Sequence, residues 1–248
     1  MASTIETGHA KNVATFEDLI SFCTGYGATY NPSKAALKLT ALTPQLTAAQ
    51  AALQAVKAAK TAYDNATNAR EISFKPLKPL ATKVINALAA TDAAKQTIDD
   101  ARTVVNKIQG KRAKTVEIPD AKALAEGAEP VKTASTSQQS YDKLIDHTQQ
   151  LVALLTAEPK YLPNENELKI ATLNTMLTDL KAKNTGVINA VTAASNARIN
   201  RDKLLYGEIT GMVDTALAVK QYVKSLFGAT SPQYKQVSGL KFTKKTGD

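Results

Sequence analysis

The two halves of the 248-residue sequence repeat one pattern in a constant register. Such a repeat indicates that one structural unit occurs twice, and it constrains the fold more than any local motif does. The Tyr-x-Pro step at Tyr30 recurs at Tyr161. The aligned pairs that follow are Leu37/Leu168, Leu39/Ile170, Leu42/Leu173, Leu46/Leu177, Val56/Val187, Asn65/Asn196 and Arg70/Arg201. We therefore expect two tandem helical repeats, at residues 15–109 and 135–239.

Each copy contains a long segment in which apolar residues alternate three and four positions apart. They are Leu39, Leu42, Leu46, Ala49, Leu53, Val56 and Tyr63 in the first copy, and Ile170, Leu173, Leu177, Leu180, Val187, Val191 and Ala194 in the second. We call this stripe the seam, because its spacing is typical of helices packed against near-parallel neighbours. Residues 33–71, interrupted only by Pro44, are expected to form one long rod. The sequence predicts an all-α fold: one antiparallel helical bundle with long coiled-coil-like helices, in which the two copies pack together.

Three segments lie outside the copies. Residues 110–134 show no sustained periodicity and are expected to be a linker, because they contain four residues that interrupt helices: Gly110, Pro119, Gly127 and Pro130. Residues 1–14 are expected to be a flexible N-terminus. Residues 240–248 are expected to be a basic C-terminal tail.

Side chains that cap exposed backbone N–H groups mark the expected helix starts. Thr15 with Asp18, and Ser135 with Gln138, resemble capping boxes. Ser231 precedes Pro232, and proline is favoured at the first position of a helix. These residues predict helices that begin near positions 15, 135 and 232.

The net charge of +9 lies on the two copies. Residues 30–114 carry 14 basic and 5 acidic side chains, and residues 161–248 carry 12 and 7. A basic cluster ends each copy: Arg102, Lys107, Lys111, Arg112 and Lys114 in the first, and Lys235, Lys241, Lys244 and Lys245, with Tyr234 and Phe242 nearby, in the second. Such clusters suit phosphate backbones, since lysine and arginine displace condensed counterions and rings stack on bases. A solvated basic face that keeps an alanine-rich bundle in solution is the alternative interpretation.

The sequence offers no pattern typical of catalysis or of a metal site. His147 is interpreted as a surface histidine, and His9 lies in the segment expected to be flexible; neither has neighbours in a ligand pattern. Cys23 has no evident activating base and is interpreted as a small core residue. We expect no catalytic residue, no metal, no cofactor and hence no enzyme.

Location is indicated only by what the sequence lacks. The N-terminal residues do not combine a basic start with an apolar run, as a secretory signal would. The longest apolar runs fall short of the roughly 18 residues that a membrane span needs. We therefore expect a cytoplasmic protein without a membrane partner.

Arg70 and Arg201 share one place in the repeat, near the end of each long segment. We expect each arginine to cap terminal carbonyls or to pair with the other copy, and a ligand-binding pair is the alternative. Asn184 is a polar residue within the seam, and such residues can fix the register of paired helices.

Four stretches of the chain, CTGYGATYNPS, YDNATNAREI, NKIQGKRAKT and SPQYKQVSGLKF, resemble a group of uncharacterised alanine-rich tandem-repeat helical proteins of environmental bacteria. The resemblance covers nearly the whole chain. It implies a natural helical family without an established function, and it supplies no catalytic or binding residue.

Three functions remain open. The first is a non-enzymatic helical scaffold that binds an acidic polymer, with nucleic acid as the leading partner, without sequence specificity. The second is a structural or protein-interaction module that forms homo-oligomers or clamps a protein partner. The third is a small-molecule site between the copies, which the sequence does not locate.

Overall fold

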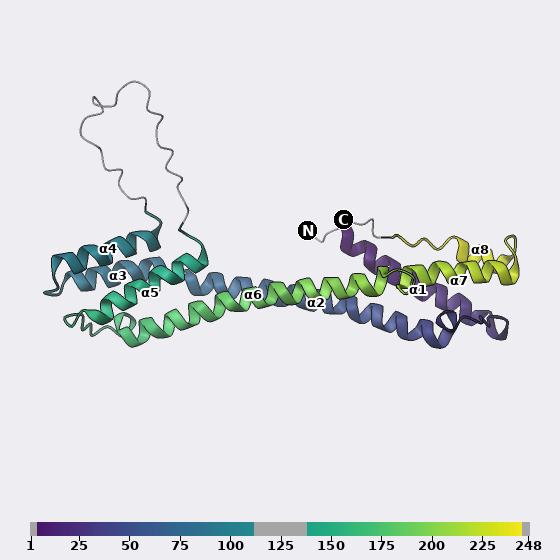
Figure 1. Cartoon of the computed structure of the whole chain (residues 1–248), viewed down its shortest axis with the longest axis horizontal. Coiled ribbons are helices and arrows are strands. Elements are labelled where there is room, and N and C mark those ends of the chain that lie inside the picture. Colours follow the sequence, from purple (N-terminus) through teal and green to yellow (C-terminus); the bar gives the residue numbers. More distant parts are fainter. Residues whose placement is uncertain (1–3, 112–137, 245–248) are drawn as a thin grey trace, which may run out of the picture. The chain divides into compact units, whose positions relative to one another are not determined.

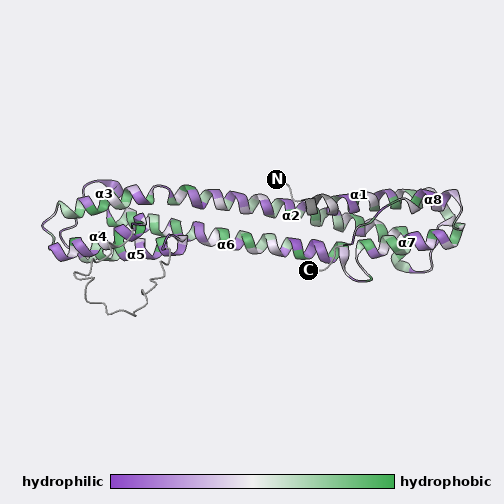
Figure 2. Ribbon diagram, turned by 90° about the horizontal axis from the view of Figure 1, so that it is seen from above, coloured by the Kyte–Doolittle hydropathy of each residue, from purple (hydrophilic) through white to green (hydrophobic). Residues whose placement is uncertain are grey.

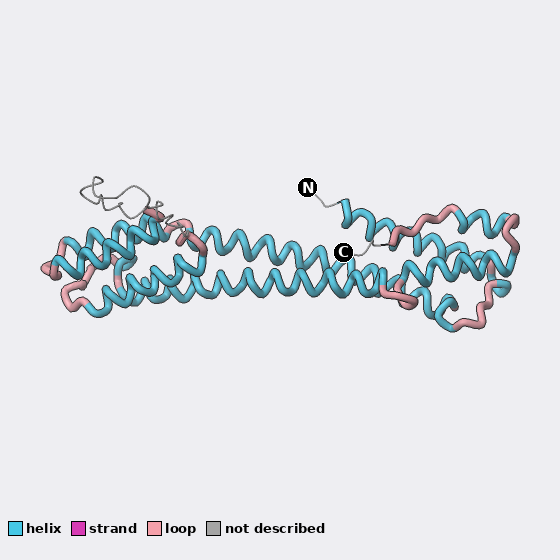
Figure 3. The backbone as a smooth tube through the Cα atoms, turned by 45° about the horizontal axis from the view of Figure 1, so that its top comes forward, coloured by secondary structure: helices cyan, strands magenta, loops and turns pink. Residues whose placement is uncertain are grey.

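The computed structural model describes residues 4–111 and 138–244. Within these residues every regular element is a helix and no strand is present, which confirms the predicted all-α fold (Figure 1, Figure 3). The α-helices are α1 (Thr4–Gly25), α2 (Leu39–Phe74), α3 (Leu77–Ala89), α4 (Lys95–Gln109), α5 (Tyr141–Ala157), α6 (Ile170–Tyr206), α7 (Met212–Phe227) and α8 (Pro232–Ser238). Three short 3₁₀ turns are η1 (Gly27–Thr29), η2 (Ala35–Leu37) and η3 (Asn166–Leu168).

The chain divides into two compact units. Unit 1 comprises residues 1–64 and 189–248, and unit 2 comprises residues 65–188. Each unit takes helices from both halves of the sequence. Unit 1 holds α1, α7 and α8, unit 2 holds α3, α4 and α5, and the long helices α2 and α6 supply residues to both. The sequence predicted one bundle; the contacts divide the chain into two compact units, in which different short helices pack on different parts of α2 and α6.

The core of unit 1 forms where α7 packs against α1 and α8. Its fully buried side chains come from five helices and include Phe16, Leu19, Leu42, Leu205, Met212, Val219 and Val237. Burying a side chain of this size contributes about 1.5–3 kcal/mol. Figure 2 shows that apolar and polar residues alternate along the helices, a pattern typical of helices that bury one face.

The core of unit 2 forms where α4 packs against both α3 and α5. Its most deeply buried side chains are Val84, Leu88, Val105, Ile108, Leu155 and Leu180. Helix α3 shows the same periodicity as the seam, since its buried residues Leu77, Ala81, Val84 and Leu88 recur every three or four positions. Unit 2 therefore has an amphipathic helical core of the predicted kind.

Burial follows the seam along most of its length. The buried members are Leu42, Ala49 and Val56 in α2, and Leu173, Leu177, Leu180, Val187 and Ala194 in α6. Two members depart from the pattern, since Tyr63 is 36% exposed and Val191 is 47% exposed. The seam is therefore partly open to solvent at these two positions, both of which belong to unit 1.

The two long helices begin in the same way, each after a 3₁₀ turn. The hydroxyl of Tyr30 donates to the carbonyl of Leu37 at 2.7 Å, and Tyr161 donates to Leu168 at 3.0 Å. All four residues are buried. Because the tyrosine holds the last residue of the turn, the long rod expected across residues 33–71 begins only at Leu39.

The N-terminal prediction is corrected by α1. Residues 4–14 lie in this helix, which begins at Thr4 rather than near Thr15. His9, Asn12 and Val13 are buried in unit 1, and this burial gives the segment a tertiary anchor that its sequence did not reveal.

Two other helix starts are defined by serine caps. The Oγ of Ser140 accepts the backbone N–H of Lys143 at 3.3 Å and caps α5, whereas Ser135 lies outside the described residues. The predicted start of α8 is confirmed, because Ser231 accepts the N–H of Tyr234 at 3.1 Å and Pro232 is the first helical residue. At the start of the expected linker, Gly110 ends α4 in the left-handed conformation, with φ 74°.

Candidate acidic-polymer interface

Positive charge is distributed unequally between the two units. The sequence of unit 1 holds 14 basic and 8 acidic residues, a net of +6. Unit 2 holds 17 and 14, a net of +3. Unit 1 is therefore the more basic unit, although along the sequence residues 30–114 are more basic than residues 161–248.

Unit 1 carries a run of residues without any carboxylate. From Thr215 to Lys244 the sequence has no acidic residue. Four lysines of this run are exposed, and we call them the lysine strip: Lys224, Lys235, Lys241 and Lys244. The strip extends along α7, since Lys244 bonds Asp214 in the first turn of α7 and Lys224 lies in the last turn.

Lys220 on α7 holds in place the end of α8 and the segment that follows it, which carry lysines of the strip. Its Nζ donates to the carbonyls of Ser238 at 3.1 Å and Leu240 at 2.7 Å, which satisfies the C-terminal end of α8. Burial lowers the pKa of Lys220. This lysine therefore fixes α8 on α7, and its exposed neighbours are the more accessible cations.

The segment after α8 is fastened to α1 by one buried side chain. The amide of Asn12 donates to the carbonyl of Thr243 at 2.8 Å and accepts the N–H of Thr243 at 3.0 Å. These two hydrogen bonds to the backbone of Thr243 resemble the pairing of neighbouring strands. Of the predicted tail at 240–248, residues 240–244 therefore have a defined position, and Lys245 lies outside the described residues.

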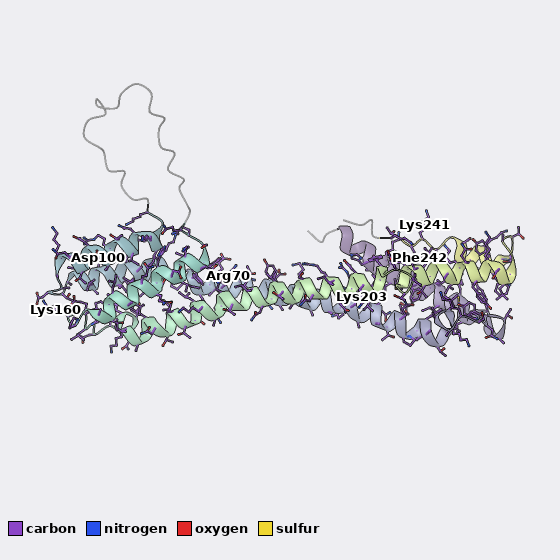
Figure 4. All side chains as sticks on the ribbon, in the orientation of Figure 1. Arg70, Asp100, Lys160, Lys203, Lys241 and Phe242 are labelled. Atoms are coloured by element: carbon purple, nitrogen blue, oxygen red, sulfur yellow. The ribbon has the colours of Figure 1, made fainter. Side chains whose placement is uncertain are left out.

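An ion pair fastens the same segment to α7. Lys244 Nζ lies 2.7 Å from Asp214 Oδ1. Its hydrogen bond, together with one from the backbone of Ile209, holds the pKa of the Asp214 carboxyl below its ordinary value. Lys244 is thus partly neutralised, whereas Lys241 is exposed and forms no ion pair within the described part of the chain (Figure 4).

The two aromatic residues of this cluster support its structure. Phe242 and Tyr234 are half-buried and pack against the core of unit 1. Lys224 Nζ lies 5.8 Å from the centroid of the Tyr234 ring, within the range of a cation–π contact. Both rings therefore have partners inside the protein, and the lysines are the more accessible groups.

The first predicted cluster lies at the end of α4 in unit 2. Arg102 pairs with Asp99 at 2.9 Å, Lys107 and Lys111 are exposed, and Arg112 and Lys114 lie outside the described residues. Sequence reasoning missed Lys143 on α5, whose charge acts together with that of Lys107 on His147. The packing of α5 on α4 creates this neighbourhood, so spacing along the chain carried no signal for it.

The matched arginines have separate structural partners. In unit 2, Arg70 Nη1 donates to Asn184 Oδ1 at 3.0 Å, and the Arg70 Cζ lies 3.9 Å from the centroid of the Tyr141 ring (Figure 4). In unit 1, Arg201 is buried and pairs with Asp202 at 2.7 Å. Arg70 thus pairs with Asn184 from the other half of the sequence, which is one of the structural roles expected for it.

The histidine predictions are corrected by burial. His147, expected at the surface, is buried, and desolvation followed by the charge of Lys107 lowers its pKa. His9, expected in a flexible segment, is buried with its Nδ1 hydrogen-bonded to the Tyr206 hydroxyl at 2.6 Å. Amphipathic packing, not a surface role, determines both positions.

Cys23 is a core residue, as predicted. Burial raises the pKa of its thiol to about 11, so the reactive thiolate is scarce near neutral pH. Within the described ranges, no three His, Cys, Asp or Glu side chains gather in a metal-binding arrangement. In those same ranges, none of the helices combines the length and apolar character that crossing a bilayer requires.

Comparisons with models of protein families, with curated proteins and with solved structures found no match to this chain. Functional inference therefore rests on the geometry and charge of its own residues.

Proposed function

We propose that this chain is a non-enzymatic helical scaffold that binds an acidic polymer through the lysine strip of unit 1. Nucleic acid is the leading candidate for this polymer. The observation that carries the proposal is the absence of any carboxylate from Thr215 to Lys244, over a surface that exposes four lysines. A phosphate backbone along this strip meets one carboxylate, Asp214, which Lys244 already pairs, and no acidic residue within the run from Thr215 to Lys244 repels it.

The expected binding is electrostatic and independent of base sequence. Lysine contacts with phosphate release counterions from the polymer, and they carry no information about the bases. If the strip neutralises two to three phosphates of a duplex, log K falls with log salt with a slope of about −2 to −3. The cluster formed by Lys107, Lys111 and Lys143 offers unit 2 a second, weaker contact of the same kind.

Fluorescence anisotropy with a labelled 20-base-pair DNA duplex and an RNA of equal length tests the proposal. The variant Lys235→Gln/Lys241→Gln removes two charges of the strip and should weaken binding several-fold at low salt. The control, Lys57→Gln/Lys60→Gln, removes two exposed lysines of α2 in unit 1, outside the lysine strip, and should bind like the parent. Equal weakening in both variants, or no binding of either polymer at low salt, would contradict the proposal.

A second candidate function is self-association. In unit 1, three apolar side chains of α2 and α6 are partly or largely exposed: Tyr63 at 36%, Val191 at 47% and Ile199 at 64%. A second copy could cover them and extend the helix packing of the seam. Light scattering across a wide concentration range tests this, since a strictly monomeric species removes it, and Val191→Lys should shift any dimer towards monomer.

We also propose that the chain is a tandem duplication whose copies exchange parts. Matched Tyr30 and Tyr161 bonds, matched 3₁₀ turns and long helices of 36 and 37 residues support it. On this proposal, each unit is an antiparallel helical bundle built from the first part of one copy and the second part of the other. Such an exchange accounts for α2 and α6 belonging to both units.

A further inference from the structure

Each unit carries a pocket at the same place in its fold. In unit 2 a pocket of about 220 Å³ lies between η3 with the start of α6 and the start of α3; its lining includes Leu80, Lys83, Glu167, Thr172 and Met176. In unit 1 a pocket of about 310 Å³ lies between η2 with the start of α2 and the start of α7; its lining includes Lys34, Ala36, Leu37, Ala41, Ile209 and Thr215. The 3₁₀ turns η2 and η3 pack on α7 and α3, respectively.

The matched positions differ in charge. Glu167 is the middle residue of η3, and its carboxylate lies 2.8 Å from Lys83 Nζ, the seventh residue of α3. The middle residue of η2 is Ala36, and the seventh residue of α7 is Ala218. The pocket of unit 2 is thus lined by its own carboxylate and ammonium pair, whereas unit 1 has alanine at both matched positions and a larger pocket.

The pocket of unit 1 keeps one positive charge. Lys34 lines it directly before η2 and is exposed. Among the residues that the structure describes, no acidic side chain forms an ion pair with Lys34. An apolar floor from Leu37 and Ala41 beside an unpaired ammonium group complements a molecule that has an aliphatic body and one carboxylate.

One wall of this pocket is a strained loop, residues 207–211. Ile209 has φ 66°, a conformation that β-branched residues rarely adopt, and its side chain is 78% exposed. The loop is held from two sides: Ile209 N–H donates to Asp214 Oδ2 at 3.1 Å, and Gln45 Nε2 donates to the carbonyl of Thr210 at 2.9 Å. The matched connection between α2 and α3 consists of Lys75 and Pro76 alone. Backbone strain of this kind concentrates at binding sites, where a fixed geometry serves a ligand.

We propose that the pocket of unit 1 binds a small aliphatic carboxylate. The carboxylate meets Lys34 and supplies the negative charge that Glu167 supplies in unit 2. The alkyl chain lies over Leu37 and Ala41 against Ile209. This site is independent of the lysine strip, and it places a small-molecule ligand between residues of the two sequence halves within unit 1.

Octanoate titrated into the full chain and followed by ¹H–¹⁵N NMR tests the proposal, with octan-1-ol as the uncharged probe. We expect saturable shifts around η2 and the 207–211 loop with octanoate and weaker binding of the alcohol. Lys34→Gln should weaken octanoate binding by up to about fivefold, the upper end of the range for one exposed ion pair. Lys38→Gln, which removes a neighbouring exposed charge outside the pocket, should leave it unchanged.

Two substitutions exchange the matched residues. Ala36→Glu places a carboxylate where unit 2 has Glu167 and should abolish octanoate binding in unit 1. Glu167→Ala frees Lys83 and should create a second octanoate site in unit 2. Ala36 is exposed and Glu167 lies in a surface pair, so both variants should keep the helical circular dichroism of the parent. The absence of saturable shifts, equal loss in Lys34→Gln and Lys38→Gln, equal binding of the alcohol, or no second site in Glu167→Ala would overturn the proposal.

Discussion

Arg70 on α2 and Asn184 on α6 are joined by a 3.0 Å hydrogen bond from the Arg70 Nη1 to the Asn184 Oδ1. The same asparagine donates from Nδ2 to Asp142 Oδ1 on α5 at 2.7 Å. Asn184 is buried, so this chain of contacts fixes three helices of unit 2 against one another. The matched position of the first copy holds Leu53, and this lock therefore distinguishes one unit from the other.

Replacing Asn184 with leucine should destabilise unit 2. The substitution leaves the partly buried guanidinium of Arg70 without its acceptor, and such a loss costs about 1–3 kcal/mol. Arg70→Met in the same background removes the stranded charge, so the double variant should lose less than the sum of the single losses. Urea unfolding of the four proteins measures this coupling, and strictly additive losses would argue against the lock.

Asn12→Ala should release the segment after α8. The substitution removes both hydrogen bonds to the Thr243 backbone and a third, at 3.2 Å, to the Tyr206 hydroxyl. Amide hydrogen exchange of residues 240–244 should accelerate, because their N–H groups then open without disrupting the core. Lys11→Ala, at the exposed neighbouring position, is the control and should leave exchange unchanged.

Acid should destabilise unit 2 through His147. Burial, then Lys107, lowers its pKa in the folded protein, while Asp146 acts in the opposite direction and Lys143 in the same one. The unfolded chain therefore binds a proton more readily, and stability is lost as the pH falls below the unfolded value of about 6.5. His147→Leu should reduce the change in the urea midpoint between pH 7.5 and pH 5. An unchanged pH dependence would show that other groups cause it.

Ile209→Gly should stabilise unit 1. Glycine adopts positive φ readily, and relieving a strained residue gains about 1 kcal/mol. Ile199→Gly is the matched control, because Ile199 is also largely exposed but lies within α6, where glycine costs about 1 kcal/mol relative to alanine. Thermal unfolding should therefore shift upward for the first variant and downward for the second.

The spacing of apolar residues predicted the helices well, because a helix that packs on one face needs apolar residues three and four positions apart. The three-and-four spacing identified Leu42 and Leu173 as buried, and each occupies a core. The same spacing included Tyr63 and Val191, which are partly exposed, because their burial depends on whether another helix covers the seam there. Ser231 and Pro232 marked a helix start correctly, since both act on backbone groups within the next turn.

Features that depend on distant partners were beyond sequence reasoning. His9 is buried beside Tyr206, which lies 197 residues away, so nothing local distinguished its segment from a flexible terminus. The neighbourhood of Lys107 and Lys143 arises only when α5 packs on α4. The sequence alignment of the two halves already placed Ala36 at the position of Glu167. Only the structure shows that Glu167 pairs with Lys83, so that this difference changes the charge of a pocket.

The division of α2 and α6 between two cores sets an order for folding during synthesis. Unit 2 is one continuous stretch, residues 65–188, and its core can close once that stretch has left the ribosome. Unit 1 needs both ends of the chain. Phe16 and Leu19 on α1 therefore remain uncovered until α7 emerges, and over that interval α1 is open to chaperones and to aggregation.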